Sequence, residues 1–186
     1  LNNTSDRVLW KDDDYSGTDW QGDFEARYPK DYADPANLSE LAAWLKSTDQ
    51  SAATGDKLTV NRTFDGVLYT TDTAAYRLAK FKSEFAQHFE KDAVLFYYLF
   101  TELFLMVDSR AKNMFPTFMA GSKWFSLPYD FDTAIGINNE GALVFSYNLE
   151  DIDHTESGAD IYNGQRSVLW INVRAAVFGD MKATYK

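Results

Sequence analysis

The feature that most constrains the fold is an almost uninterrupted apolar segment, residues 93–107. Of its fifteen residues only Thr101 and Glu102 are polar. A helix that crosses a bilayer needs about 20 apolar residues, so this segment is too short to span one. A helix that is apolar on nearly all sides must be surrounded by other elements. The sequence therefore predicts a central buried helix, which Asp92 caps at its start.

Three further helices are predicted around this segment. Asn37 and Glu40 have the spacing of a capping box, and leucines at helical spacing follow until about Lys46. Asp72 or Thr73 can cap the next helix. In each helix, apolar residues recur at intervals of three and four, as on one helical face. They are Leu38, Leu41, Ala42 and Leu45, then Leu78, Phe81, Phe85 and Phe89, and, over residues 168–177, Leu169, Val173, Ala176 and Val177.

Short strands are predicted on either side of the helices. Residues 24–28 alternate with a period of two and stop before Pro29, which is typical of an edge strand. Residues 123–127 and 142–145 are also short and apolar. Polar stretches are expected to form loops at residues 1–22, 47–57 and 148–166, and Asp65-Gly66 predicts a turn. The predicted fold class is therefore α+β with a helix-dominated core.

Charge and composition exclude several classes of function. The chain carries 18 Lys and Arg residues against 28 Asp and Glu residues, a formal net charge of −10. This charge opposes nonspecific binding to nucleic acid or to an anionic membrane surface. Cysteine is absent, and the two histidines, His88 and His154, have no partner at metal-ligand spacing. Trp10, Trp20 and Trp124 are candidates for a surface that binds a partner.

The residues with the clearest chemical pattern follow the apolar segment. Asp108 and Asn113 are five positions apart with Arg110 between them, and Asp130-Phe131-Asp132 begins 22 residues after Asp108. Protein kinases have a catalytic Asp, four residues, a metal-binding Asn and a later metal-binding Asp. Mg²⁺ prefers hard oxygen ligands, which Asn113, Asp130 and Asp132 would supply. Arg110 occupies the place of the kinase lysine that meets the transferring phosphate.

Other roles for these residues are open. Asp108 can cap the preceding helix, with Arg110 or a neighbouring lysine as a surface ion pair. Asp132 can cap a following turn. Asp130 and Asp132 point the same way from one strand, so they do not suit a glycosidase pair, whose carboxylates flank a bond. Residues 12–23 have the acidic spacing of a calcium loop, and a solvated loop explains the same residues.

Two longer strings carry a resemblance to a known family. They are VDSRAKN at residues 107–113 and KWFSLPYDFDTAIG at residues 123–136. These strings resemble the spore-coat CotH kinase family, in which a Lys-Trp strand leads to a Pro-aromatic-Asp-x-Asp segment and a glycine. The NNEG at residues 138–141 is similar to the variant found in bacteriophage particle proteins. The resemblance covers about residues 90–175.

The resemblance implies a divergent protein-kinase-like fold that binds ATP and Mg²⁺ and phosphorylates protein serine or the protein itself. By motif position it implies Asp108 as the catalytic Asp, Asn113 and Asp130 as metal ligands, and Asp132 as a second acidic ligand. The chain departs from kinase patterns in its phosphate loop, because no two of its 10 glycines are two residues apart. No lysine has an ATP-binding motif around it, so the nucleotide-binding residues stay unassigned.

We therefore expect two parts within one structural unit of a longer chain. Residues 1–57 form an N-terminal arm, a short strand and a helix, and residues 58–186 form a core like the C-terminal lobe of a kinase. The predicted function is transfer of phosphate from Mg²⁺–ATP to Ser or Thr of a protein substrate. The alternative is a bacteriophage structural protein that binds other virion proteins and keeps the scaffold without catalysis. No signal peptide or transmembrane segment is predicted, which favours a phage virion, the bacterial cytoplasm or the spore coat.

Overall fold

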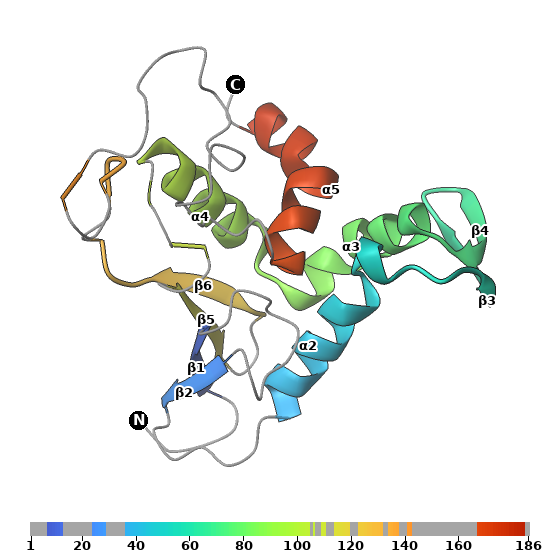
Figure 1. Cartoon of the computed structure of the whole chain (residues 1–186), viewed down its shortest axis with the longest axis horizontal. Helices are drawn as coiled ribbons and strands as arrows, with labels where there is room; N and C mark the ends of the chain where they lie inside the picture. Colours follow the sequence, from blue (N-terminus) through green and yellow to red (C-terminus); the bar gives the residue numbers. More distant parts are fainter. Residues whose placement is uncertain are drawn as a thin grey trace.

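The computed structural model confirms an α+β fold, with four helices and two antiparallel sheets in the part of the chain that it describes (Figure 1). That part comprises residues 7–12, 24–28, 36–104, 106, 109–110, 114–119, 123–131, 134–137, 141–142 and 167–184. The elements are β1 (Arg7–Asp12), β2 (Phe24–Tyr28), α2 (Ala36–Ser47), the 3-10 turn η1 (Gln50–Ala52), β3 (Gly55–Phe64), β4 (Val67–Asp72), α3 (Ala74–His88), α4 (Lys91–Leu103), β5 (Met114–Met119), β6 (Phe125–Pro128) and α5 (Val168–Thr184).

The predicted helices are confirmed, with changes at their starts. α3 is capped by Thr73, whose hydroxyl accepts a hydrogen bond from the Tyr76 backbone N–H at 3.1 Å. Asp72, the alternative cap, binds Arg77 instead. α2 begins at Ala36, so Asn37 lies in its first turn and the predicted cap at Asn37 is wrong.

The apolar segment forms α4, but the helix is buried on one face only. Val94, Tyr97 and Tyr98 are buried, whereas Phe96 is 59% exposed and Leu103 is 76% exposed. The helix ends at Leu103, four residues before the end of the apolar run. The expectation of a helix surrounded on all sides is therefore wrong. No helix in the described ranges is long and apolar enough to cross a membrane.

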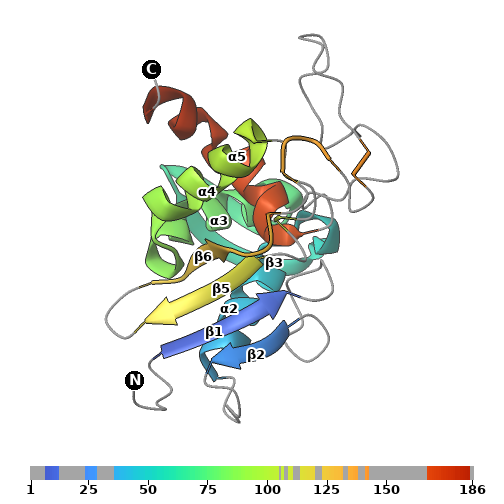
Figure 2. The same ribbon diagram turned by 90° about the vertical axis from the view of Figure 1, so that its left-hand side faces the viewer.

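Four strands form an antiparallel sheet in the order β2-β1-β5-β6 (Figure 2). β2 is the predicted strand and lies at the edge, as Pro29 indicated. β6 is the strand predicted at residues 123–127, with shifted bounds. The expected loop at residues 1–22 is wrong for residues 7–12, because β1 pairs with β2 on one side and with β5 on the other.

β5 is a strand that the sequence did not predict, because it contains a proline. Pro116 faces Ser126 of β6, while the pairing with β1 stops at the neighbouring pair Leu9 and Thr117. Pro116 therefore has a strand neighbour on one side only, which is where a sheet tolerates a proline.

The second sheet is the β3–β4 hairpin, which lies far from the four-stranded sheet (Figure 1). The predicted turn is confirmed, since Asp65 and Gly66 have φ of 47° and 78°, as a tight hairpin turn requires. Next to this turn, Phe64 contacts the rings of Tyr69 and Tyr76. The expected loop at residues 47–57 is wrong in part, because it includes η1 and the start of β3.

The core lies between the four helices and β5–β6. Its members share near-complete burial and are Leu38, Leu41, Trp44, Leu45, Phe81, Phe85, Phe89, Val94, Leu95, Tyr97, Tyr98, Met114, Trp124, Leu169, Trp170, Val173 and Val177. Trp124 packs on Phe118 with ring centroids 5.3 Å apart, so the suggestion that it marks a partner surface is wrong. The strand predicted at residues 142–145 falls, beyond residue 142, outside the described residues, as do the loop at 148–166 and Trp20.

Candidate functional site

Arg110, the cation predicted to lie near phosphate, is completely buried against α4. Its guanidinium forms an ion pair with Glu102 and lies over the ring of Tyr98, 4.4 Å from the centroid. Trp170 of α5 also packs on Tyr98, with 6.1 Å between the two ring centroids. A buried guanidinium needs both a counter-charge and contacts with its plane, and Glu102 and Tyr98 supply them.

The residue before Arg110 is also attached to α4. The Tyr97 hydroxyl donates a hydrogen bond to the backbone carbonyl of Ser109. Burial raises the pKa of the Tyr97 hydroxyl well above its ordinary value, and it raises the pKa of Tyr98 as well, although the charge of Arg110 opposes both shifts. Both phenols therefore stay protonated at neutral pH and act as neutral groups that orient the 109–110 segment.

Asp130 lies just after β6, in a segment with unusual backbone conformations. Its side chain is exposed, and its φ is 60°. Ile135 has φ of 65° and Gly136 has φ of 71°. The left-handed region costs about 1–2 kcal/mol for an L-residue, and a β-branched residue is rare there. Such conformations concentrate at functional sites, so we treat this segment as part of the candidate site.

The same segment packs against the C-terminal half of α4. The Phe131 ring contacts that of Phe100 edge-on at 6.1 Å between centroids. The Ile135 backbone N–H donates to the Phe104 carbonyl at 2.6 Å. The C-terminal half of α4 thus contacts both predicted motifs, with Arg110 on one side of the helix and the segment after β6 on another.

Three of the five predicted site residues, Asp108, Asn113 and Asp132, lie outside the described residues. Within the described part, no group of three or more His, Cys, Asp or Glu side chains is placed to hold a metal ion. Asp130 is the one predicted ligand that this part includes. The roles assigned to these residues, and to Arg110, remain predictions.

Sequence reasoning missed the residues that hold Arg110. Tyr98 and Glu102, which contact Arg110, and Tyr97, which binds Ser109, were assigned to the apolar helix without a polar role. One signal was available, because Glu102 is the sole charged residue in the segment 93–107. A charge in such a segment requires a partner, and Arg110 is the nearest cation that follows it in the chain.

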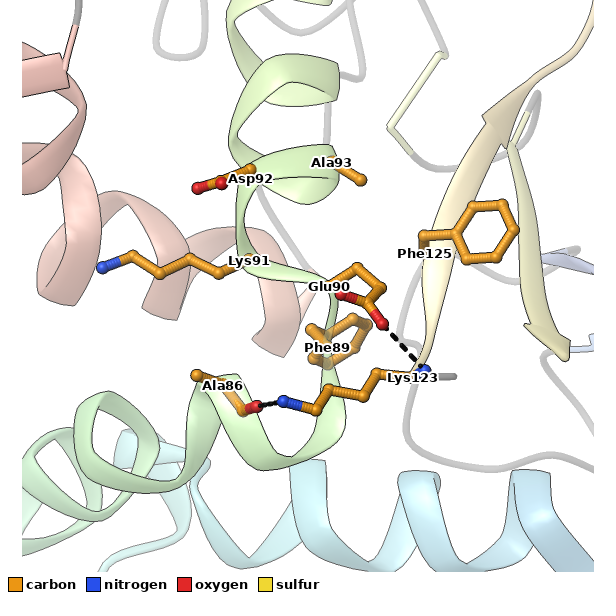
Figure 3. A pocket seen from close by; sticks show the side chains of 8 residues that line it. All are labelled: Ala86, Phe89, Glu90, Lys91, Asp92, Ala93, Lys123 and Phe125. Atoms are coloured by element: carbon orange, nitrogen blue, oxygen red, sulfur yellow. Dashed lines mark hydrogen bonds between the residues drawn. The ribbon is translucent and has the colours of Figure 1, made fainter. Parts of the chain in front are cut away.

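A pocket of about 620 Å³ lies at the opposite, N-terminal end of α4 (Figure 3). The Glu90 carboxylate accepts a hydrogen bond from the Lys123 backbone N–H at 3.2 Å, and the Lys123 ammonium donates to the Ala86 carbonyl. Beside it, the Glu90 backbone N–H donates a hydrogen bond to the Trp124 carbonyl at 2.8 Å. These contacts fasten β6 to the junction of α3 and α4, so they position the candidate site from its far end.

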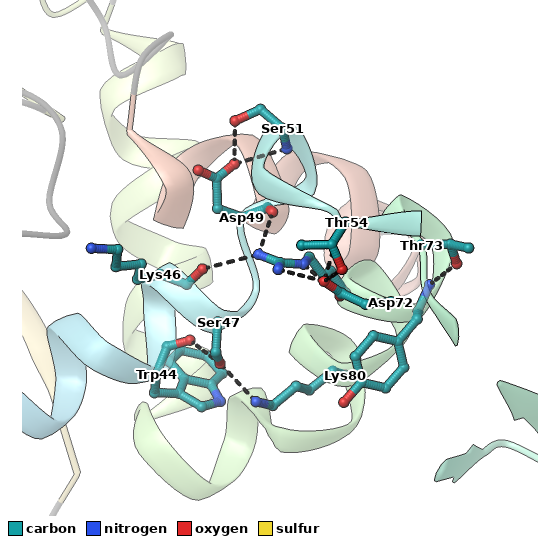
Figure 4. Close-up of polar contacts among 11 residues, drawn as sticks. Trp44, Lys46, Ser47, Asp49, Ser51, Thr54, Asp72, Thr73 and Lys80 are labelled. Carbon is teal, nitrogen blue, oxygen red and sulfur yellow. Dashed lines mark hydrogen bonds and ion pairs between the residues drawn. The ribbon is translucent and has the colours of Figure 1, made fainter. Parts of the chain in front are cut away.

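A polar cluster fastens the hairpin base to α2 and α3 (Figure 4). Arg77 donates to both carboxylate oxygens of Asp72 at 2.7 Å, and to the backbone carbonyls of Asp49 and Lys46 at 3.0 and 3.3 Å. Asp72 also accepts from the backbone N–H and hydroxyl of Thr54. The Arg77 hydrogen bonds hold the pKa of Asp72 well below its usual range. This cluster is a structural clamp, since its polar groups are satisfied within the protein.

His88, one of the two histidines, has an aromatic rather than a metal-binding environment. Its ring stacks on Trp44 with centroids 4.1 Å apart. Burial lowers the pKa of His88, so the neutral ring is favoured there. His154 lies outside the described residues.

Comparison of the chain with protein-family models, with characterised proteins and with solved structures gave no match.

Proposed function

We propose that the chain is a CotH-like domain of the protein-kinase type, which binds Mg²⁺–ATP and transfers phosphate to Ser or Thr of a protein. The observation that carries the proposal is the position of the two motif segments. Ser109 and Arg110 contact α4, and Phe131 and Ile135 contact the same helix or the residue that follows it. Two segments that must act on one nucleotide have to meet, and a shared helix provides the support.

The proposed reaction requires little covalent catalysis by the protein. Phosphoryl transfer depends on positioning and on neutralising the phosphate charge. In the proposal, Asn113, Asp130 and Asp132 hold Mg²⁺, which neutralises that charge. Asp108 orients the attacking hydroxyl and accepts its proton. The donor set fits, since all four side chains offer hard oxygen atoms, and Asp130 is exposed to solvent where a metal can reach it.

Removing the Asp130 charge should abolish the response to nucleotide. We expect Mg²⁺–ATP to raise the melting temperature of the wild type, because a ligand at 100 times its Kd adds about 2.7 kcal/mol. Asp130→Asn should lose most of this shift, since an amide is a weaker Mg²⁺ ligand while Asn still tolerates the left-handed backbone. Differential scanning fluorimetry with and without Mg²⁺–ATP measures the effect.

The matched control is Asp65→Asn. Asp65 is also an exposed aspartate with positive φ, 47°, but it lies in the hairpin turn. It should keep the full wild-type shift. An unshifted wild type, or equal shifts in the Asp65 and Asp130 variants, contradicts the proposal.

A second candidate function is that of a bacteriophage structural protein that keeps the scaffold without catalysis. The burial of Arg110 in an ion pair with Glu102 favours it, because a guanidinium held there is turned away from a bound phosphate. The two candidates differ in turnover. Incubation with labelled Mg²⁺–ATP and a protein substrate should label protein for the kinase, whereas nucleotide binding without label favours the structural role.

A further inference from the structure

A continuous apolar surface runs along the exposed side of α4 and onto the segment after β6. We define this aromatic ridge as Phe96, Phe100, Leu103, Phe104, Phe131 and Ile135. Phe100 contacts Phe96 at 6.0 Å, Phe104 at 4.9 Å and Phe131 at 6.1 Å between ring centroids. Five of the six residues are at least 42% exposed, and Phe100 is half-buried. Exposed apolar residues scattered singly are ordinary, but a contiguous patch marks an interaction surface.

The charge around the ridge indicates which kind of binding partner it attracts. Within residues 93–106 and 127–137 the charged residues of the sequence are Glu102, Asp130 and Asp132. Glu102 is paired with Arg110, so the exposed Asp130 supplies the acidic charge beside the ridge in the described residues. The whole chain carries a net charge of −10. A second copy would bring another −10 to the interface, and an anionic lipid surface would also be repelled. A partner with basic residues around an apolar centre is attracted instead.

The form of the ridge indicates the shape of the partner. Phe96, Phe100 and Phe104 are spaced by four residues and form a row along the helix. Rows at this spacing pack into the grooves of another helix. Leu103 and Phe131 lie beside the row and widen the contact.

We propose that the aromatic ridge is a docking surface for a basic amphipathic helix of a partner protein. The apolar face of that helix covers Phe96, Phe100 and Leu103, and its Lys or Arg residues face Asp130. The ridge borders the segment that carries Asp130, the metal ligand proposed above. Its test changes Phe96 and Leu103 and measures peptide binding rather than nucleotide binding, so either proposal can fail without the other.

The test uses a labelled synthetic helix of leucine and lysine in an amphipathic pattern, with fluorescence anisotropy as the readout. The wild-type chain should bind it, and Phe96→Ser/Leu103→Ser should bind at least tenfold more weakly, as expected for loss of central apolar contacts. The matched control is Leu58→Ser/Leu68→Ser, which removes exposed apolar side chains from the hairpin, 51% and 62% exposed. It should bind as the wild type does.

Charge is tested with a second peptide in which glutamate replaces lysine. This peptide should show no binding, and equal binding of the two peptides would overturn the charge argument. If the ridge variant and the hairpin variant bind the lysine peptide equally weakly, the ridge is not the binding site and the proposal is overturned. Ridge-dependent self-association in sedimentation, or ridge-dependent binding to phosphatidylcholine vesicles, assigns the surface to a second copy or to lipid and overturns the proposed partner. A drop in melting temperature confined to the ridge variant shows that the chain itself covers the ridge, and also overturns it.

Discussion

Replacing Asp72 with Asn is expected to lower the free energy of unfolding by about 3–5 kcal/mol. Asp72 is 2% exposed and forms two hydrogen bonds to the Arg77 guanidinium. The substitution leaves Arg77, whose side chain is 12% exposed, without its counter-charge and sets an amide NH₂ group against its N–H donors. Urea unfolding followed by tryptophan fluorescence measures the loss.

The control is Glu84→Gln, which weakens a second ion pair between the hairpin and α3. Glu84 lies 3.7 Å from Arg62, whose side chain is 58% exposed, and it also accepts a hydrogen bond from the Trp44 indole. Gln keeps an acceptor for Trp44, and exposed pairs contribute about 0–1 kcal/mol. Similar losses for Asp72→Asn and Glu84→Gln would contradict the assignment of Asp72 and Arg77 as a clamp.

The clamp also predicts how stability depends on pH. The hydrogen bonds from Arg77 lower the pKa of Asp72 in the folded state below its ordinary value of 3.8. The unfolded chain therefore takes up this proton first as the pH falls, and the stabilisation is complete above about pH 4 and lost below it. The free energy of unfolding should fall more steeply below about pH 4 in the wild type than in Asp72→Asn. Equal slopes of the free energy of unfolding against pH in the two proteins would contradict the lowered pKa of Asp72.

Arg110→Met is expected to lower the free energy of unfolding by about 2–3 kcal/mol, below the full range for a buried pair because Glu102 keeps some access to solvent. Met fills much of the space but loses the ion pair and the contact with the Tyr98 ring. Arg110→Lys keeps the charge without the planar guanidinium, so we expect a smaller but clear loss. Chemical unfolding of the wild type, Arg110→Lys and Arg110→Met measures their free energies of unfolding and so tests the expected order.

A measurement of nucleotide binding distinguishes a structural role of Arg110 from a role in contacting phosphate. If Arg110 meets phosphate during the reaction, Arg110→Lys should weaken Mg²⁺–ATP binding beyond what its lower stability explains, in titrations well below its melting temperature. An unchanged nucleotide Kd in Arg110→Lys would assign Arg110 to structure alone. Ordinary surface substitutions change the free energy of unfolding by less than about 0.5 kcal/mol. A loss of that size in Arg110→Met would contradict the burial of Arg110.

The helices were predictable because their information is local. The spacing of Phe81, Phe85 and Phe89 aligns two rings on one face of α3 with a third at its C-cap. Thr73, directly before Ala74, caps the start of the helix. The spacing of the rings and the cap can both be read in a window of twenty residues. The one-sided exposure of α4 could not be read in this way, because the segment 93–107 is apolar all round and its neighbours decide which face is covered.

The strands and the site depended on distant partners. β1 is polar at both ends, and its strand character follows from pairing with β5, over one hundred residues away in the chain. The motif residues were visible in the sequence, and α4 was expected to deliver them. Of the partners of Arg110, Glu102 left a signal as the sole charge of the apolar segment, whereas Tyr98 left none. Tyr98 meets Arg110 only because the fold places Arg110 beside α4.

The central place of β1 has a consequence for synthesis of the chain. A ribosome makes β1 and β2 before the other described elements, and this pair alone is a two-stranded ribbon of marginal stability. The edge of β1 that β5 covers has no partner until Met119 is made, after α2, α3, α4 and the hairpin. An open strand edge is a template for pairing with other chains. The helices therefore form while the nascent N-terminal ribbon is still unprotected, and β5 closes that edge when it is added.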